Sequence, residues 1–174
     1  PAVTVGALIG GKIDVVQGIL YILLHLIAAV AATATFHFTK GVSLPPNVAL
    51  KDEMIRSLSV EVLTTFILVF VIYAVAMGVN TDSKSLDGDN SEREAAKAKL
   101  NFAPIAIGFT LGFLCFFEHA NFNPAAASGP FLYKLMTDFH HFGFSQLAPL
   151  GIIWIGDLVG ATLAALLWNF FFAA

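Results

Sequence analysis

The residues best suited to act on another molecule lie in one short stretch, NFNPAAASGP, between Asn121 and Pro130. Asn123, Pro124 and Ala125 form an Asn-Pro-Ala box between two long apolar segments. Asparagine caps helices and can offer its amide to a passing solute, and proline suits the first helical position because its missing N–H would have had no partner there. The box predicts a helix that begins inside an apolar environment, although an ordinary turn between two membrane spans is the alternative.

The first residues of the chain, PAVT, look like the end of a second such box. Pro1 and Ala2 would belong to it, and we expect its asparagine to precede the given sequence. A helix N-terminus exposes unpaired N–H groups and carries about half a positive charge. Two such interrupted segments at corresponding places in the chain indicate a pore or a binding site. The predicted chemistry there is electrostatic, because the positive helix ends would repel a cation.

Other kinds of chemistry have little support in the sequence. A nucleophile with its base, or a group of metal ligands, does not occur at a suitable spacing, and His140 and His141 are adjacent in the chain. The sequence therefore predicts neither an enzyme nor a cofactor or metal site. The net charge of -3, without a Lys/Arg-rich run, also argues against nucleic-acid binding.

The composition predicts an integral, multi-pass membrane protein, because 57% of the 174 residues are hydrophobic and 12% are charged. A spanning helix needs about 20 mostly apolar residues. Short apolar segments that cannot span occur in membrane proteins where they line a pore or a binding site. The elements expected in a single domain, 1–174, are spans at about 15–36, 58–79, 102–117 and 147–172, half-helices at 1–12 and 124–138, and a polar loop at 80–100.

Five motifs across the chain resemble the major intrinsic protein family, the aquaporins and aquaglyceroporins. They are PAVT at 1–4, Glu61 in VEVLTTFILVF, APIAIG at 103–108, the box at 123–125 followed by Gly129 and Pro130, and WIG at 154–156. The resemblance implies an all-α inverted repeat of six spans with two half-helices that meet at the bilayer centre. This chain would contain four spans and both half-helices, and the first two spans would be missing. A homotetrameric channel for water or small neutral solutes, such as glycerol, urea or ammonia, is the implied function.

In the family, the glutamate matched by Glu61 is a buried acid that braces the loop with the second box. An uncompensated charge in a span costs at least about 2.5 kcal/mol, so partners are expected. The alternative is a position at the headgroup boundary beside Arg56. Trp154, Gly156 and Gly160 are further candidates for structural support, the two glycines because GxxxG permits close helix packing.

The resemblance assigns the outer selectivity filter to Cys115, Ala120 and Ala126. Ala126 occupies the position where family members with a tight filter have arginine, so we expect a wider and less polar constriction. Two interpretations stay open: a channel that also passes solutes larger than water, or a non-conducting aquaporin-like structural subunit of a larger membrane protein complex. Ala127, where the glycerol-conducting branch usually has aspartate, leaves the solute undecided.

Three ionisable residues are candidates for gating or for buried polar contacts: His25, His119 and Asp157. His25 and Asp157 replace a glutamine and a proline that are usual in the family, and ionisable groups within a membrane are commonly functional. They could pair with each other, contact other subunits or stay neutral. His119 could act as a pH-sensitive gate, because imidazole titrates near neutral pH, or it could lie in a solvated loop.

Overall fold

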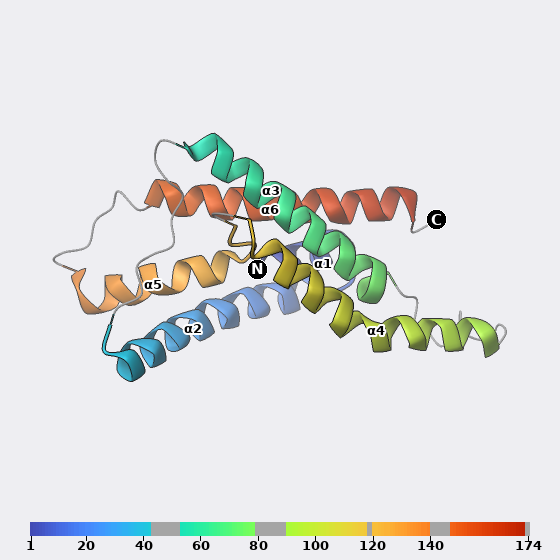
Figure 1. Cartoon of the computed structure of the whole chain (residues 1–174), viewed down its shortest axis with the longest axis horizontal. Coiled ribbons are helices and arrows are strands. Elements are labelled where there is room, and N and C mark those ends of the chain that lie inside the picture. Colours follow the sequence, from blue (N-terminus) through green and yellow to red (C-terminus); the bar gives the residue numbers. More distant parts are fainter. Residues whose placement is uncertain (43–52, 79–89, 118–119, 140–146, 173–174) are drawn as a thin grey trace.

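The structure is a computed structural model of the whole chain, and it describes residues 1–42, 53–78, 90–117, 120–139 and 147–172. These residues form α1 (Ala2–Ile9), α2 (Val15–Lys40), α3 (Met54–Ile72), the π-helical turn η2 (Tyr73–Met77), α4 (Asn90–Leu114), α5 (Pro124–Thr137) and α6 (Leu147–Phe171) (Figure 1). The described part of the chain contains no strand, which confirms the predicted all-α class.

Three helical stretches are long and apolar enough to cross a membrane: α2, α3 together with η2 (Met54–Met77), and α6. They support the predicted integral membrane protein. The remaining expected span, 102–117, falls largely in α4, whose 25 residues are long enough but not apolar enough to be counted with these three. Residues 90–100 were expected in the polar loop, with a helix start at EREAAKAK as the alternative, and they are helical because their Ala, Glu, Lys and Arg residues are good helix formers.

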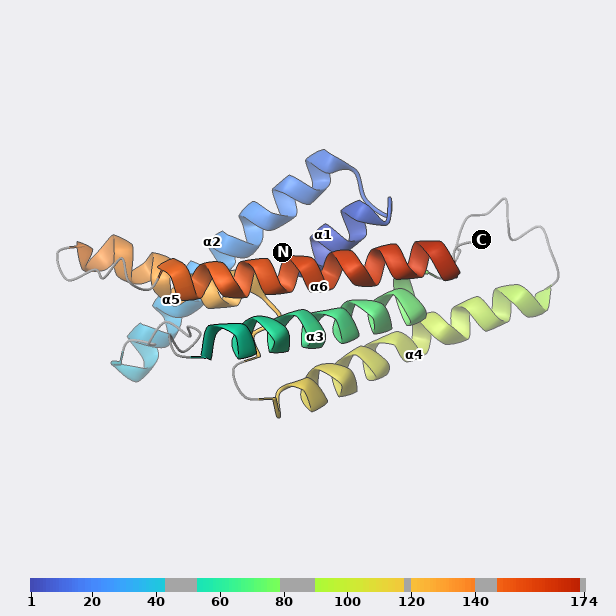
Figure 2. The same cartoon turned by 90° about the horizontal axis from the view of Figure 1, so that it is seen from above.

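The centre of the fold is the pair α3 and α6, which pack closely along their lengths (Figures 1 and 2). A Cβ added at Gly156 would lie 2.6 Å from the Cβ of Glu61, and one at Gly160 would lie 2.4 Å from the backbone oxygen of Val62. Both distances are shorter than real side chains tolerate. The two glycines therefore let the helices approach backbone to backbone, as small residues do in membrane proteins.

The short helices α1 and α5 are each held against a longer helix. α1 packs on α6, where Gly6 lies close to Ala161, and α5 packs on α2, where a Cβ added at Gly129 would lie 2.7 Å from the backbone oxygen of Ala29. The buried hydroxyl of Tyr73 donates a hydrogen bond of 2.7 Å to the backbone oxygen of Gly6. These contacts fix two helices that are too short to cross a membrane.

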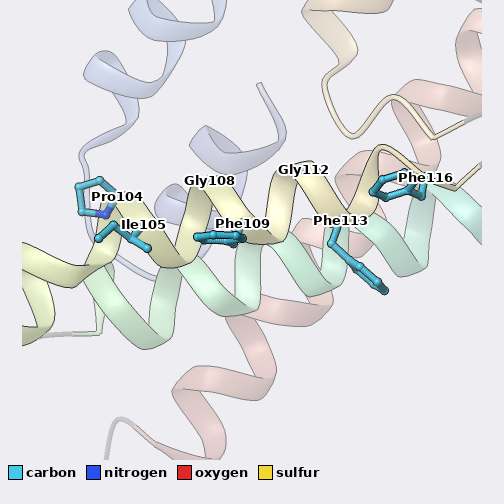
Figure 3. Close-up of a pocket in the computed structure, with 7 residues that line it drawn as sticks. All are labelled: Pro104, Ile105, Gly108, Phe109, Gly112, Phe113 and Phe116. Carbon is cyan, nitrogen blue, oxygen red and sulfur yellow. The ribbon is translucent and has the colours of Figure 1, made fainter.

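An open apolar groove runs along one face of α4 and the turn after it (Figure 3). Its volume is about 650 Å³, and it is lined by Pro104, Ile105, Gly108, Phe109, Gly112, Phe113 and Phe116. All of these side chains are apolar, so the groove has no group that could orient a polar solute.

Pro104 removes a backbone hydrogen bond inside α4, and the helix changes direction along its length (Figure 1).

Candidate functional site

Asn123 caps the N-terminus of α5, where the second box lies. Its side-chain oxygen accepts the backbone N–H of Ala125 at 3.2 Å, and Pro124 takes the first helical position. Asn123 and Ala126 are exposed, whereas Pro124, Ala125 and residues 127–131 are buried. Because the two exposed positions are three residues apart, they share one face of the helix. Asn123 and Ala126 are therefore the residues of this first turn that are accessible from outside the described structure.

Pro1 and Ala2, the residues expected in the first box, lie at the start of α1. Pro1 precedes the helix, Ala2 is its first residue, and both are buried. In both overall views the N-terminus of the chain lies beside the N-terminal end of α5, and α1 and α5 run away from this point in opposite directions (Figures 1 and 2). The structure thus brings the residues of the two boxes into one region. The positive ends of two helix dipoles meet there.

Glu61 of α3 is fully buried and contacts the loop that precedes Asn123. Its two side-chain oxygens each accept the backbone N–H of Asn121 at 2.9 Å, and one also accepts the backbone N–H of Phe122 at 3.0 Å. The side-chain amide of Asn121 donates a further hydrogen bond of 2.6 Å. Phe122 has a φ of 39°, which is uncommon for a residue with a side chain. The hydrogen bonds offset the free energy of burying the carboxylate and hold the loop in this conformation.

Glu61 lies inside the protein rather than at its surface beside Arg56, which was the alternative interpretation. Arg56 is exposed and forms an ion pair of 3.1 Å with Glu53, one turn closer to the start of α3. The side chain of Glu61 points instead into the protein, where hydrogen bonds from the box loop replace its contacts with water.

Asp157 of α6 is also fully buried. The hydroxyl of Thr65 donates a hydrogen bond of 2.7 Å to its Oδ1, whereas its Oδ2 has no donor among the described residues.

His25 is exposed on α2, with its ring centroid 6.5 Å from that of Tyr21. The structure therefore does not bring His25 and Asp157 together as a hydrogen-bonded pair. His119 lies outside the described residues.

Trp154 of α6 is linked to the first turn of α5. Its indole N–H donates a hydrogen bond of 2.9 Å to the hydroxyl of Ser128, which in turn donates one of 2.7 Å to the backbone oxygen of Pro124. The sequence motifs indicate Trp154 but not Ser128. Its position four residues after Pro124 is a signal that could have found it, because Ser hydroxyls bond the helix backbone at this spacing.

The three filter candidates lie on the segments next to the second box. Cys115 is exposed in the turn after α4, Ala120 is half-buried in the loop, and Ala126 is exposed on α5. All three side chains are small and uncharged. The N-terminal ends of α1 and α5 are therefore the source of positive potential in this group of elements.

No role was predicted for three further polar residues that contribute to these contacts: Asn121, Thr65 and Tyr73. Each is a polar residue in or beside an apolar segment, and such groups need hydrogen-bond partners when they are buried. That requirement is the signal that could have identified them. Their partners lie 60, 92 and 67 positions away in the chain, so local sequence patterns could not have named the contacts.

Residues 1–168 match the family described as Major intrinsic protein. The chain is 32% identical over 178 residues to Aquaporin TIP1-1 of Arabidopsis thaliana, with 99% of this chain and 61% of that protein aligned. It is 31% identical over 180 residues to Aquaporin TIP1-2 of Musa acuminata, covering 97% and 60%, and 32% identical over 193 residues to Aquaporin-B of Dictyostelium discoideum, covering 98% and 62%. The chain thus spans about three fifths of the length of these relatives.

Proposed function

This chain belongs to the major intrinsic protein family, and on this premise we propose that it forms a membrane channel for the passive transport of water or small neutral solutes. Members of the family are channels rather than enzymes. Glycerol, urea and ammonia are the solutes beyond water that we include in the proposal. We further propose that the protein assembles in the lipid bilayer as a homotetramer.

The observation that carries the proposal is the meeting of two helix N-termini beside a loop held by Glu61. The N–H groups at these ends have no partners within their own helices and give the region a positive potential. Water can orient its oxygen toward them and pass, whereas a cation or a proton is repelled. The exposed Asn123 supplies an amide that can hydrogen-bond each passing molecule.

The proposed solute range rests on the three filter candidates. Cys115, Ala120 and Ala126 present little volume and no charge, so molecules larger than water meet less steric resistance there. Exclusion of cations then depends on the dipoles of α1 and α5, because arginine is absent from these positions. We therefore propose a channel that is less restricted to water than one with arginine after the second box.

A second candidate function is a non-conducting structural subunit of a larger membrane protein complex. The observation that favours it is the buried Asp157, an additional acid in a spanning helix that transport of a neutral solute does not require. The absence of arginine at position 126 also favours the structural subunit, because a subunit that does not conduct does not need a selectivity filter.

Stopped-flow light scattering on proteoliposomes that contain the complete protein separates the two candidates. The channel proposal predicts that water permeability, and glycerol permeability in a second experiment, exceed those of empty liposomes of the same lipid. Permeabilities equal to those of empty liposomes would favour the structural subunit. Size-exclusion chromatography with light scattering on the same preparation tests the tetramer.

A further inference from the structure

Two buried carboxyl groups meet where α3 packs on α6. Glu61 and Asp157 are both fully buried, and the turns of α3 and α6 that carry them pack against each other. The backbone geometry agrees, because Gly156, the neighbour of Asp157, has no room for a Cβ against the Cβ of Glu61. Thr65, one turn after Glu61 on α3, binds the Oδ1 of Asp157. The two acids therefore occupy one small polar cluster between apolar helix surfaces.

The hydrogen bonds differ between the two acids. Glu61 accepts hydrogen bonds from three groups, which are the backbone N–H of Asn121, its side-chain amide and the backbone N–H of Phe122. These three donors make four contacts, because the backbone nitrogen of Asn121 lies 2.9 Å from both oxygens. A carboxylate has about four lone-pair sites, so a fourth donor would let each site accept its own hydrogen. Asp157 has a single donor, Thr65, and its Oδ2 has none in the described part of the chain.

Two neighbouring carboxylates cannot both stay charged in a medium of low dielectric constant without a cation between them. No Lys, Arg or His forms an ion pair with either acid in the described structure. A proton on one of the two acids removes the repulsion. A proton on Oδ2 of Asp157 would also let this unpartnered atom donate a hydrogen bond to Glu61.

We propose that Asp157 holds a proton and donates it through Oδ2 to the carboxylate of Glu61. Asp157 is then a positioning residue. It supplies a fourth donor, which orients Glu61 toward the loop from Asn121 to Asn123. The importance of this loop for transport rests on the function proposed above, whereas the protonation state of Asp157 can be measured whether or not the protein conducts.

Infrared spectroscopy of the purified protein tests the proton directly, because a protonated carboxylic acid has a carbonyl stretching band that a carboxylate lacks. The measurement uses neutral pH and a detergent without ester groups, since ester carbonyls absorb in the same region. We expect the wild-type protein to show this band and Asp157→Asn to lose it. Glu53→Gln is the matched control: Glu53 is an acid paired with Arg56 near the surface, and its replacement should leave the band unchanged.

Hydrogen–deuterium exchange of the segment around Asn121 and Phe122 tests the positioning role. Asp157→Asn keeps an N–H donor in the place of the acid, so exchange should stay close to wild type. Asp157→Val keeps the approximate volume but has no donor, so exchange should become several-fold faster. An absent band in the wild type, or a band that persists in Asp157→Asn, would overturn the proposed proton. Equal exchange in Asn and Val variants would overturn the positioning role.

Discussion

Both side-chain oxygens of Glu61 accept the backbone N–H of Asn121 at 2.9 Å, although the two residues are 60 positions apart in the chain. The contact joins the middle of the α3 span to the loop that starts the second half-helix. Because the loop contains Phe122 in an uncommon backbone conformation, it needs such an external support. The position of Asn123 therefore depends on a charged group buried in a neighbouring helix.

Replacing Glu61 with Gln should destabilise the protein and disturb the second box. Glutamine has the shape of glutamate, but its NH2 group would face N–H groups that now donate hydrogen bonds to the carboxylate. Two donors would then face each other. The loss of charged hydrogen bonds should lower the free energy of unfolding by about 2 kcal/mol. In a protein of this size that corresponds to a fall in the melting temperature of roughly 4–8 °C, which can be measured in detergent. An unchanged melting temperature together with unchanged water permeability would contradict the supporting role.

Gly160→Ala should destabilise the contact between α3 and α6. The new Cβ would lie 2.4 Å from the backbone oxygen of Val62, and backbone cannot move aside as a flexible side chain can. We expect a loss of about 1–3 kcal/mol in the free energy of unfolding. Gly112→Ala is the matched control, because a Cβ there meets nothing within 4 Å and alanine is the better helix former. Equal melting temperatures for the two variants would argue against the packing described for α6.

Ala126→Arg should narrow the proposed filter. Position 126 is exposed on the same helix face as Asn123, so a long cationic side chain there would project into the path of the solute. Glycerol permeability of proteoliposomes should fall by at least about tenfold, which corresponds to about 1.4 kcal/mol in the barrier, and water permeability should fall less. Ala126→Leu separates bulk from charge. If arginine leaves the ratio of glycerol to water permeability unchanged, position 126 does not belong to the filter.

Cys115 should make the channel sensitive to thiol reagents. It is the one cysteine in the sequence, and it is exposed in the turn after α4. A mercurial should therefore react there and block transport, and a reducing thiol should restore it. Cys115→Ser should conduct normally in the presence of the reagent. Inhibition that persists in the serine variant would show that Cys115 does not line the transport path.

The sequence predicted those features of the site that depend on local chemistry. The Asn-Pro pair at 123–124 indicated a helix start, since capping and the missing proline N–H act within one turn. Residues 90–100 were assigned to a loop on their polarity, although their helix-forming residues extend α4 through them. In apolar spans such as α6, hydropathy does not reveal which face meets another helix. The contact of Asp157 with Thr65 therefore required the structure.

The proposed function depends on two helix ends that let water pass and repel positive charge. The most direct test measures osmotic water permeability and proton flux in the same proteoliposomes, with empty liposomes as the reference. We predict water permeability well above the reference and proton flux equal to it. A proton flux that rises with the water permeability would contradict exclusion by the helix dipoles, and water permeability equal to that of empty liposomes would contradict the channel itself.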